Sequence, residues 1–349
     1  MYIPSLDGIR AVSILIVFMA HAGWGHIVPG GFGVTVFFFL SGYLITTLLL
    51  GEIANHGRIA LGAFYMRRLI RLVPPLLITL GFGIILTYLG FLSDPFDWPT
   101  IASQIFFYFN YYFLYGSANP IQGSGVFWSL SVEEHFYLIW PFSLPWLLAT
   151  GKPRIWVATA LLALLIWRAF RFANGADMLE LYYATDTRID SLLWGCLLAM
   201  LPRPDAARIF SENPMILWPW VGAAVGGLLI SFLVRDETFR AVLRYSLQGA
   251  CLMPLFHYAV TMPHHVLFRA LNATAIRRIG VWSYTIYLVH FMVLQALQAT
   301  WLAPYTVLTA SLGGAISVVY AWAVYRLVEA PLRPLRKSFT GAAPDSERA

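Results

Sequence analysis

The sequence DGIRAVSILIVFMAHAGWGHIVPG, residues 7–30, predicts a first membrane helix over about residues 9–28. Arg10 stands at its start, and His21 follows eleven residues later inside the apolar run. At about 1.5 Å of rise per residue the two lie roughly 16 Å apart along the axis, and about three full turns bring both side chains to nearly the same face. An ionisable group inside a membrane span is costly, so this pair indicates a functional site.

The composition is that of an integral membrane protein. Of the 349 residues, 59% are hydrophobic and only 11% are charged, whereas a soluble domain carries about 25% charged residues. We therefore expect an all-α, polytopic membrane protein whose natural units are its spans. The net charge is +6. In a membrane protein Lys and Arg gather in cytoplasmic loops, so this positive charge does not indicate a nucleic-acid partner, and none is expected. Cys196 and Cys251 offer neither a disulfide framework nor metal-ligand spacing, so no metal is expected.

Apolar runs predict about ten transmembrane helices. The run at 189–201 is short for a span, so its helix is expected to begin earlier, near Tyr182. The aromatic, partly polar stretch 98–115 fits either a re-entrant or interfacial helix or an eleventh span. The predicted spans cover approximately residues 9–28, 32–50, 72–92, 133–149, 155–172, 189–201, 215–234, 242–261, 280–301 and 304–327.

The distribution of Lys and Arg predicts the orientation. With ten spans and a cytoplasmic N-terminus, most of the 23 basic residues fall at cytoplasmic ends, and the segment 93–127 carries none. This bias predicts that both termini are cytoplasmic and argues against a full span at 98–115. The first helix lacks the features of a cleaved signal and is expected to remain a span. A membrane domain is expected over residues 1–333 and a polar, loose cytoplasmic tail over 334–349. The cations assigned to the opposite side are Arg168, Arg171, Arg188, Arg235, Arg240 and Arg244.

His21, with Asp7 and Arg10 before it, is the first candidate for chemistry. One interpretation is a histidine that packs against a neighbouring helix and bonds to it. The other is a general base, because an imidazole with an ordinary pKa near neutrality can take a proton from a hydroxyl.

A basic cluster, FYMRRLIRLVPP at 64–75, is the second candidate. Arg68 and Arg71 are three residues apart and share a helix face, while Arg67 lies on another. The cluster is either an ordinary group of cytoplasmic cations or an anion clamp, because guanidinium groups match phosphate oxygens well.

Acidic residues open the predicted span in WSLSVEEHFYLIWP, 128–141. Glu133 and Glu134 in a first turn, with Ser131 as a cap, would favour the helix dipole. Glu133 also shares a stripe with aromatic residues, from which it could orient a sugar hydroxyl or His21.

Two later motifs place polar side chains in or beside apolar helices. In ATDTRIDSLLWG, 184–195, ion pairing among Asp186, Arg188 and Asp190 is the simplest account. In WSYTIYLVH, 282–290, a polar stripe follows one helix face. Aromatic belts account for some tyrosines but not for a histidine near mid-span. The members of this stripe are Ser283, Tyr287 and His290.

Seven motifs in order resemble the bacterial integral-membrane acyltransferase-3 family, whose members O-acylate surface polysaccharides, lipids, antibiotics and other acceptors. The resemblance covers almost the whole chain, and Asp7 and Ser41 lie within two of its motifs as further candidates. The motifs are LDGIRAVSILIVFMAH (6–21), FFFLSGYLIT (37–46), FYMRRLIRLVPP (64–75), WSLSVEEHFYLIWP (128–141), DTRIDSLLWG (186–195), SYTIYLVH (283–290) and YRLVEAPL (325–332).

The resemblance implies roles at matching positions. Arg10 and His21 match the family's Arg-x10-His motif, whose histidine is regarded as catalytic. Glu133, rather than Glu134, matches the family's glutamate before x-x-Phe-Tyr. The Arg-x-x-Arg motif, associated with an acyl-CoA donor on the cytoplasmic side, falls on Arg68 and Arg71, with Arg67 beside them.

The resemblance further implies an O-acyltransferase of the bacterial inner membrane. Its co-substrate would be acyl-CoA, with acetyl-CoA expected, and its acceptor a carbohydrate or glycosylated molecule reached from outside. Some relatives carry a C-terminal SGNH-type hydrolase domain, which is not expected in this chain. The alternative is a transporter that passes acyl groups to a separate periplasmic transferase.

Overall fold

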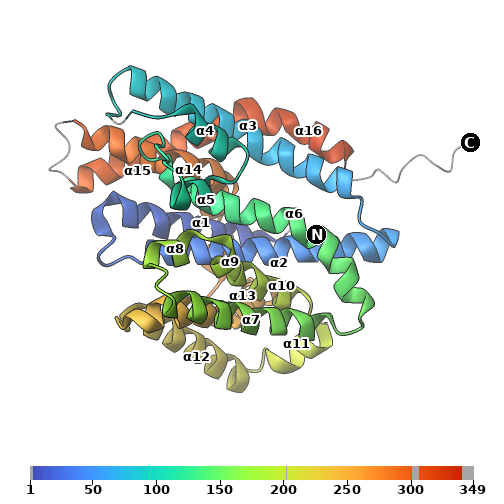
Figure 1. Ribbon diagram of the computed structural model, residues 1–349. Helices are drawn as coiled ribbons and strands as arrows, with labels where there is room; N and C mark the ends of the chain where they lie inside the picture. The colour runs from blue at the N-terminus through green and yellow to red at the C-terminus, as the bar shows by residue number, and fades with distance from the viewer. Residues whose placement is uncertain (1–2, 94, 202, 301–305, 340–349) are drawn as a thin grey trace, which may run out of the picture.

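Helices alone build the regular structure of the described chain. The computed structural model describes residues 3–93, 95–201, 203–300 and 306–339, and every regular element among them is a helix (Figure 1). The all-α prediction is therefore confirmed. The predicted spans 280–301 and 304–327 end and begin outside the described residues, as do positions 340–349 of the expected tail.

Within the described chain, seven helical stretches are long and apolar enough to cross a membrane. Three other predicted spans fall on α6 (Trp128–Ala149), α10 (Asp190–Ala199) and α13 (Arg244–Thr261). The count of ten and the placement of the termini stay predictions. The seven stretches are α1 (Pro4–Met19) with η1 (Ala20–Trp24), α2 (Gly30–His56), α3 (Leu61–Tyr88), α7 (Pro153–Ala173), α12 (Pro214–Leu233), α14 (Thr274–Gln298), and α15 (Thr306–Val324) with η5 (Tyr325–Glu329) and α16 (Ala330–Ser338).

The shorter elements lie between these helices. The ordinary α-helices among them are α4 (Trp98–Ile105), α5 (Phe109–Tyr115), α8 (Met178–Tyr183), α9 (Thr185–Arg188) and α11 (Arg203–Ile209). The 3₁₀ segments are η2 (Ser124–Phe127) and η4 (Arg269–Asn272), and a π-helix, η3 (Phe239–Leu243), leads into α13. η1 and η5 are also π-helices.

Two predicted helices are broken into pieces. The stretch 98–115 forms α4 and α5 instead of one span, because the chain turns at Phe107, whose φ is 57°. The helix expected from Tyr182 through 201 is interrupted at Ala184, whose ψ of 138° is extended, so α8, α9 and α10 follow one another. In both places a local backbone turn overrides the apolar pattern.

Glycines allow pairs of helices to approach backbone to backbone. A methyl group at Gly42 of α2 would lie 1.9 Å from the carbonyl oxygen of Leu192 in α10, and one at Gly195 would lie 2.0 Å from that of Phe39. A methyl group at Gly280 of α14 would lie 1.8 Å from the carbonyl oxygen of Asp7 in α1. Small residues at membrane-helix interfaces permit this close packing.

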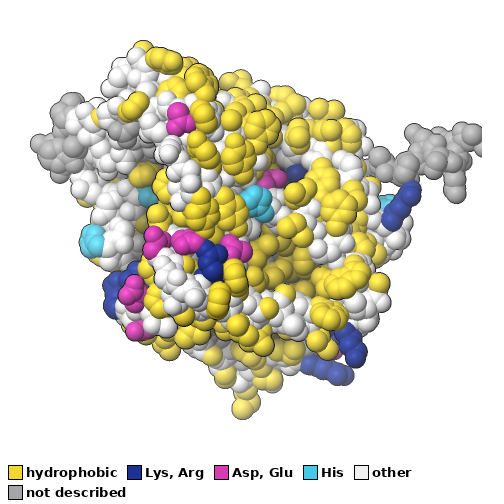
Figure 2. All heavy atoms as spheres, viewed as in Figure 1, with side chains coloured by type: hydrophobic (Ala, Val, Ile, Leu, Met, Phe, Trp, Pro, Cys, Tyr) yellow, Lys and Arg dark blue, Asp and Glu magenta, His cyan; other side chains and the backbone are white. Residues whose placement is uncertain are grey.

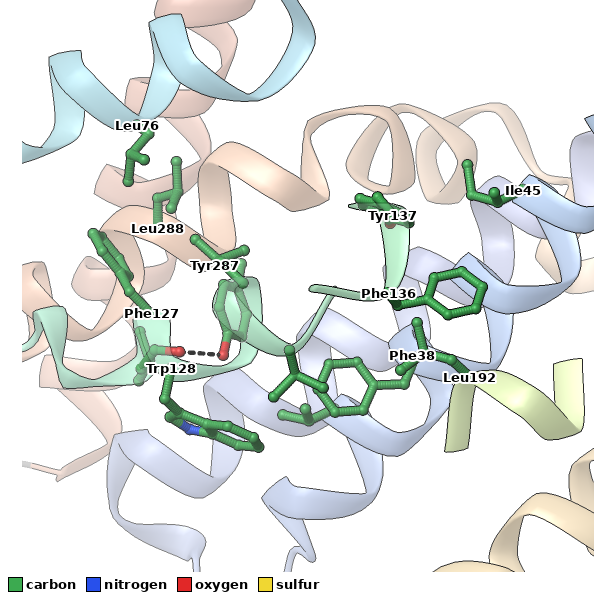
Figure 3. Packing of buried hydrophobic residues seen from close by; sticks show 14 of the residues in the cluster. Phe38, Ile45, Leu76, Phe127, Trp128, Phe136, Tyr137, Leu192, Tyr287 and Leu288 are labelled. Atoms are coloured by element: carbon green, nitrogen blue, oxygen red, sulfur yellow. Dashed lines mark hydrogen bonds between the residues drawn. The ribbon is translucent and has the colours of Figure 1, made fainter. Parts of the chain in front are cut away.

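Aromatic and aliphatic side chains fill the space between the helices. Phe38, Phe136 and Leu192 come from α2, α6 and α10 and point toward one another (Figure 3). Tyr287 of α14 lies in the same core, where its hydroxyl donates to the Val126 carbonyl oxygen at 2.8 Å. This core joins α2, α6 and α10 and holds α14 beside the start of α6.

We expect Gly42→Ala to lower the free energy of unfolding by about 1–3 kcal/mol, because the added methyl group overpacks the α2–α10 interface. Gly51→Ala is the matched control in the same helix, since no atom lies within 4 Å of its added methyl group. Melting of the two detergent-solubilised variants makes the comparison. Equal melting temperatures would contradict the close contact.

Candidate active site

A cavity of about 1380 Å³ opens at one end of the bundle, between the first turns of α1 and α3 and the last turns of α2 and α13. Most of the predicted site residues meet there. Those that line it are Asp7, Arg10, Ser41, Arg67, Arg68, Arg71, Glu133, Ser283 and Tyr287. His21, His290, Asp186, Arg188 and Asp190 are not part of its wall.

The three arginines of α3 differ in their partners. Arg68 lies over the ring of Tyr137, 4.8 Å from its centroid, and Arg71 makes no ion pair with a described residue. Arg67 pairs with Glu52 at 3.2 Å and donates to the backbone carbonyl of Phe339 at 2.7 Å. Arg68 and Arg71 thus keep guanidinium groups free for an anion, whereas Arg67 is held at the rim.

Arg10 enters the cavity from α1. Its NH1 group donates to Oδ1 of Asp7 at 2.8 Å, one turn earlier in the helix. This ion pair fixes the arginine and partly neutralises it. Six arginines, Arg58 and Arg336 among them, and four carboxylates line the cavity, so its wall carries a net positive charge.

Glu133 lies in the interior of α6, not in its first turn. The helix begins at Trp128 without a side-chain cap, so the predicted capping by Ser131 is wrong. The Glu133 carboxylate accepts hydrogen bonds from Ser41 at 2.9 Å and from Tyr137 at 3.3 Å. Glu133 therefore orders the cavity wall between α2 and α6, while His21 bonds to another residue.

His21 lies in the π-helix η1, beside His290 of α14. Nδ1 of His290 lies 2.7 Å from the Tyr287 carbonyl oxygen, which can only accept, so Nδ1 of His290 carries the proton. In neutral His290, Nε2 is then an acceptor, and Nδ1–H of His21 donates to it at 3.0 Å. Nε2 of His21 is left with a lone pair. The ring also stacks on Phe291, with centroids 4.4 Å apart.

The two α1 residues lie at different distances from the ends of their helical stretch. The helical stretch runs from Pro4 to Trp24, so His21 lies roughly 5 Å from its far end and Arg10 about 9 Å from its start. A chain of rings links His21 to the cavity. The Tyr287 ring lies 5.7 Å from that of His290, which lies 5.2 Å from that of His21.

The acidic residues at 186 and 190 pair with α7, so the predicted ion pairing within the motif is wrong. Asp190 pairs with Arg168, and both side chains are fully buried. Asp186 accepts from Arg171 at 3.0 Å and from Tyr111 at 3.0 Å. Burial, with the Asp186 carboxylate beside it, raises the pKa of Tyr111 above its usual value. These residues hold α7 against the α8–α10 segment.

Arg188 is buried without a carboxylate partner among the described residues. Its guanidinium lies 3.7 Å from the ring centroid of Tyr245 and 5.2 Å from that of Tyr182, and it donates to Thr35 at 3.2 Å. Aromatic faces stabilise this cation.

A family model described as an acyltransferase domain matches residues 3–326. The chain belongs to the acyltransferase-3 family. It is 28% identical to the peptidoglycan O-acetyltransferase OatA of Listeria monocytogenes serovar 1/2a (strain ATCC BAA-679 / EGD-e), over 95% of this chain and 56% of that protein. It is 30% identical to the O-acetyltransferase OatA of Staphylococcus aureus (strain NCTC 8325 / PS 47), over 98% of this chain and 58% of that protein. The chain thus spans less than two thirds of the length of these relatives. No solved structure matches it significantly.

Two cavity residues of this acyltransferase-3 chain were not among the predicted site residues. Tyr137 contacts both Arg68 and Glu133, and its place one turn after Glu133 in α6 was the available signal. Arg336 was assigned to the polar tail, but α16 continues across residue 333 and brings it to the cavity. The domain boundary itself stays a prediction.

We expect Asp190→Ala to destabilise the protein by about 3–5 kcal/mol, because it leaves Arg168 buried without its charge partner. Asp205→Ala is the matched control. This variant removes the ion pair between Asp205 and Arg154 of α7, whose two side chains are 42% and 45% exposed. Its loss should lower the free energy of unfolding by at most about 1 kcal/mol. Thermal melting of both variants in detergent tests the contrast, and a mild effect at both sites would contradict it.

Proposed function

We propose that this multi-pass membrane protein transfers an acyl group, with acetyl expected, from acyl-CoA to a hydroxyl of a carbohydrate acceptor. The observation that carries the proposal is the link between a basic cavity and a histidine pair. Arg68 and Arg71, which form no ion pair with a described residue, lie in the cavity, and Tyr287 connects its wall to the hydrogen-bonded His21 and His290. Membership of the acyltransferase-3 family supports the reaction type.

The basic cavity is the proposed donor site. Arg68 and Arg71 are suited to the phosphates of CoA, because guanidinium groups bind phosphate through paired, charge-assisted hydrogen bonds. Arg10 and Arg336 add positive charge to the wall. Under the predicted orientation this end faces the cytoplasm, where acyl-CoA is made. The acyl arm would extend along the cavity toward Tyr287.

His21 is the proposed general base. Its Nε2 takes the proton of the acceptor hydroxyl as the hydroxyl oxygen attacks the thioester carbonyl. Nδ1–H of His21 keeps its hydrogen bond to Nε2 of His290 during this step. The tetrahedral intermediate then collapses, its C–S bond breaks, and the CoA sulfur leaves with the proton returned by His21. His290 acts as a positioning residue, because its bond fixes the tautomer and the ring of His21.

A carbohydrate acceptor is supported by the relatives, one of which is named a peptidoglycan O-acetyltransferase. The location we propose is the bacterial inner membrane. One observation favours a second candidate, a carrier that delivers acyl groups to a separate transferase: Arg71 and His21 lie toward opposite ends of the bundle. Purified protein given labelled acetyl-CoA and a soluble glycan separates the two. A transferase labels the glycan alone, whereas a carrier requires a second protein.

We expect His21→Ala to lower the rate of acyl transfer by about 10²–10⁴-fold, the usual contribution of a general base. Transfer to glycan by purified protein, at matched protein levels, is the measurement. His264→Ala, which removes an exposed loop histidine, is the control and should keep the wild-type rate. Wild-type transfer by His21→Ala would overturn the assignment.

We expect Arg71→Gln to raise the KM for acetyl-CoA roughly tenfold or more, because a charge-assisted hydrogen bond contributes about 1.5–3 kcal/mol. The KM for a short acetyl thioester without phosphates should stay unchanged, since that donor cannot use the arginine. Arg269→Gln, which removes an exposed arginine of η4, is the control. An equal rise for both donors would show that Arg71 does not bind the phosphates.

A further inference from the structure

A second pocket, of about 260 Å³, lies at the opposite end of the bundle from the donor cavity. It is bounded by the link between η1 and α2, the end of α12, η3 and the first turns of α13. At the left of Figure 2, over the neighbouring ends of α12 and α13, basic and acidic side chains reach the surface. The basic residues that line the pocket are His26, Arg235, Arg240 and Arg244.

The three arginines of this pocket make no ion pair with a described residue. Arg244 donates to the Tyr245 hydroxyl at 2.8 Å, but its Nε is buried and has no hydrogen-bond partner in the described part of the chain. Asp236 is close in sequence, yet it does not line the pocket and instead caps the following turn by accepting from the Phe239 amide at 2.7 Å. A concentration of unpaired guanidinium groups fits an oxyanion.

The pocket also holds an unused acceptor. Gln248 is 3% exposed, and its Nε2 donates to Ser231 at 3.2 Å, but its Oε1 is buried and accepts no hydrogen bond from a described residue. A buried acceptor of this kind is costly unless a ligand supplies a donor. An anion that also carries a hydroxyl would satisfy both the arginines and Gln248. The wall also includes Tyr182 and Tyr245, whose rings hold the Arg188 guanidinium behind the pocket.

The distribution of arginines at this end of the bundle also favours an anion in the pocket. Under the predicted orientation this end lies outside the cell, where Lys and Arg are scarce. Of the cations assigned to that side, Arg168 and Arg171 pair with carboxylates, and Arg188 is stacked among aromatic rings. The remaining three, Arg235, Arg240 and Arg244, all line this one pocket.

Backbone geometry places the pocket beside the proposed base. Gly25 and His26 of its wall directly follow η1, the π-helix that carries His21, and Arg240 lies in a second π-helix, η3. π-helical turns occur frequently at functional sites. A ligand held here would approach His21 from the end opposite the donor cavity.

We propose that this pocket binds the anionic part of the acceptor, a phosphate or carboxylate carried on a sugar or another polyol. Calling the ligand an acceptor rests on the proposed acyl transfer. Binding of the anion to the pocket does not depend on that function and is measured separately. The arginines hold the oxyanion, and Gln248 accepts a bond from a neighbouring hydroxyl. The protein would therefore prefer charged glycans to neutral ones.

Equilibrium binding to the purified full chain tests the proposal, with glucose 1-phosphate, glucuronate, inorganic phosphate and glucose as probes. Both sugar anions should bind roughly tenfold or more tightly than glucose, and more tightly than inorganic phosphate, because charge-assisted bonds and the Gln248 contact add together. Arg240→Gln with Arg244→Gln should remove that preference. Arg208→Gln, which removes an exposed arginine of α11, is the matched control.

Other variants locate the site. Arg71→Gln in the donor cavity should leave binding of the sugar anions unchanged, and a loss equal to that of the double variant would overturn the proposal. It would also be overturned by equal affinity for glucose and its phosphate, or by vesicles of phosphatidylglycerol displacing the sugar phosphate, since the site would then hold a lipid headgroup. His21→Ala should bind the sugar anions normally. Binding without acyl transfer in the wild-type protein would refute the proposed function and leave this inference standing.

Discussion

The close, parallel packing of α1 against α14 is the contact on which the rest of the arrangement depends. Near one end, Gly280 lets α14 approach the backbone at Asp7, and near the other, His290 bonds to His21. One interface thus sets both the position of the cavity wall and the orientation of the proposed base. Because the backbone contact at Gly280 leaves α14 little freedom to slide along α1, a shift of α14 at the cavity would also move His290 against His21.

Polar groups inside this bundle fall into two kinds. Asp190 with Arg168 illustrates the first, in which every buried charge has a partner and the pair joins two helices. Arg71 and Arg244 illustrate the second, in which donors face a cavity or pocket and no carboxylate of the described residues pairs with them. Unpaired donors are costly in an apolar setting, which is the reason for proposing ligands at the cavity and at the pocket. The two sets lie at opposite ends of the same helices.

Much of the architecture follows from local pattern in the sequence. The composition predicted the helical membrane fold, and the motifs around Arg10, Ser41, Arg68 and Glu133 predicted residues that the structure brings to one cavity. The apolar runs set the helices, and α1, α2, α3 and α6 each bring one of these motifs to the cavity wall. Whether these residues act as proposed is a matter for the variants described above.

Other features depend on contacts between distant segments, which periodicity does not encode. The bond between His21 and His290 joins residues 269 positions apart, and the partners of Asp186 and Asp190 come from α7. The break at Phe107 was hidden because a single residue with positive φ leaves the apolar run intact. The start of α6 at Trp128 was hidden because Ser131 and Glu133 resemble an ordinary helix cap.

The π-helix η1 has a geometric consequence for the end of the molecule that lies opposite the cavity. A π-turn contains one residue more than an α-turn of the same height. The helix ends within this turn, at Trp24, so the turn sets the direction in which the chain leaves α1. Gly23, with its φ of 108°, completes the change of direction. The angular position of His21 and the path of the Gly25–Pro29 link therefore share one origin, and a return of this turn to α-helical geometry would shift both together.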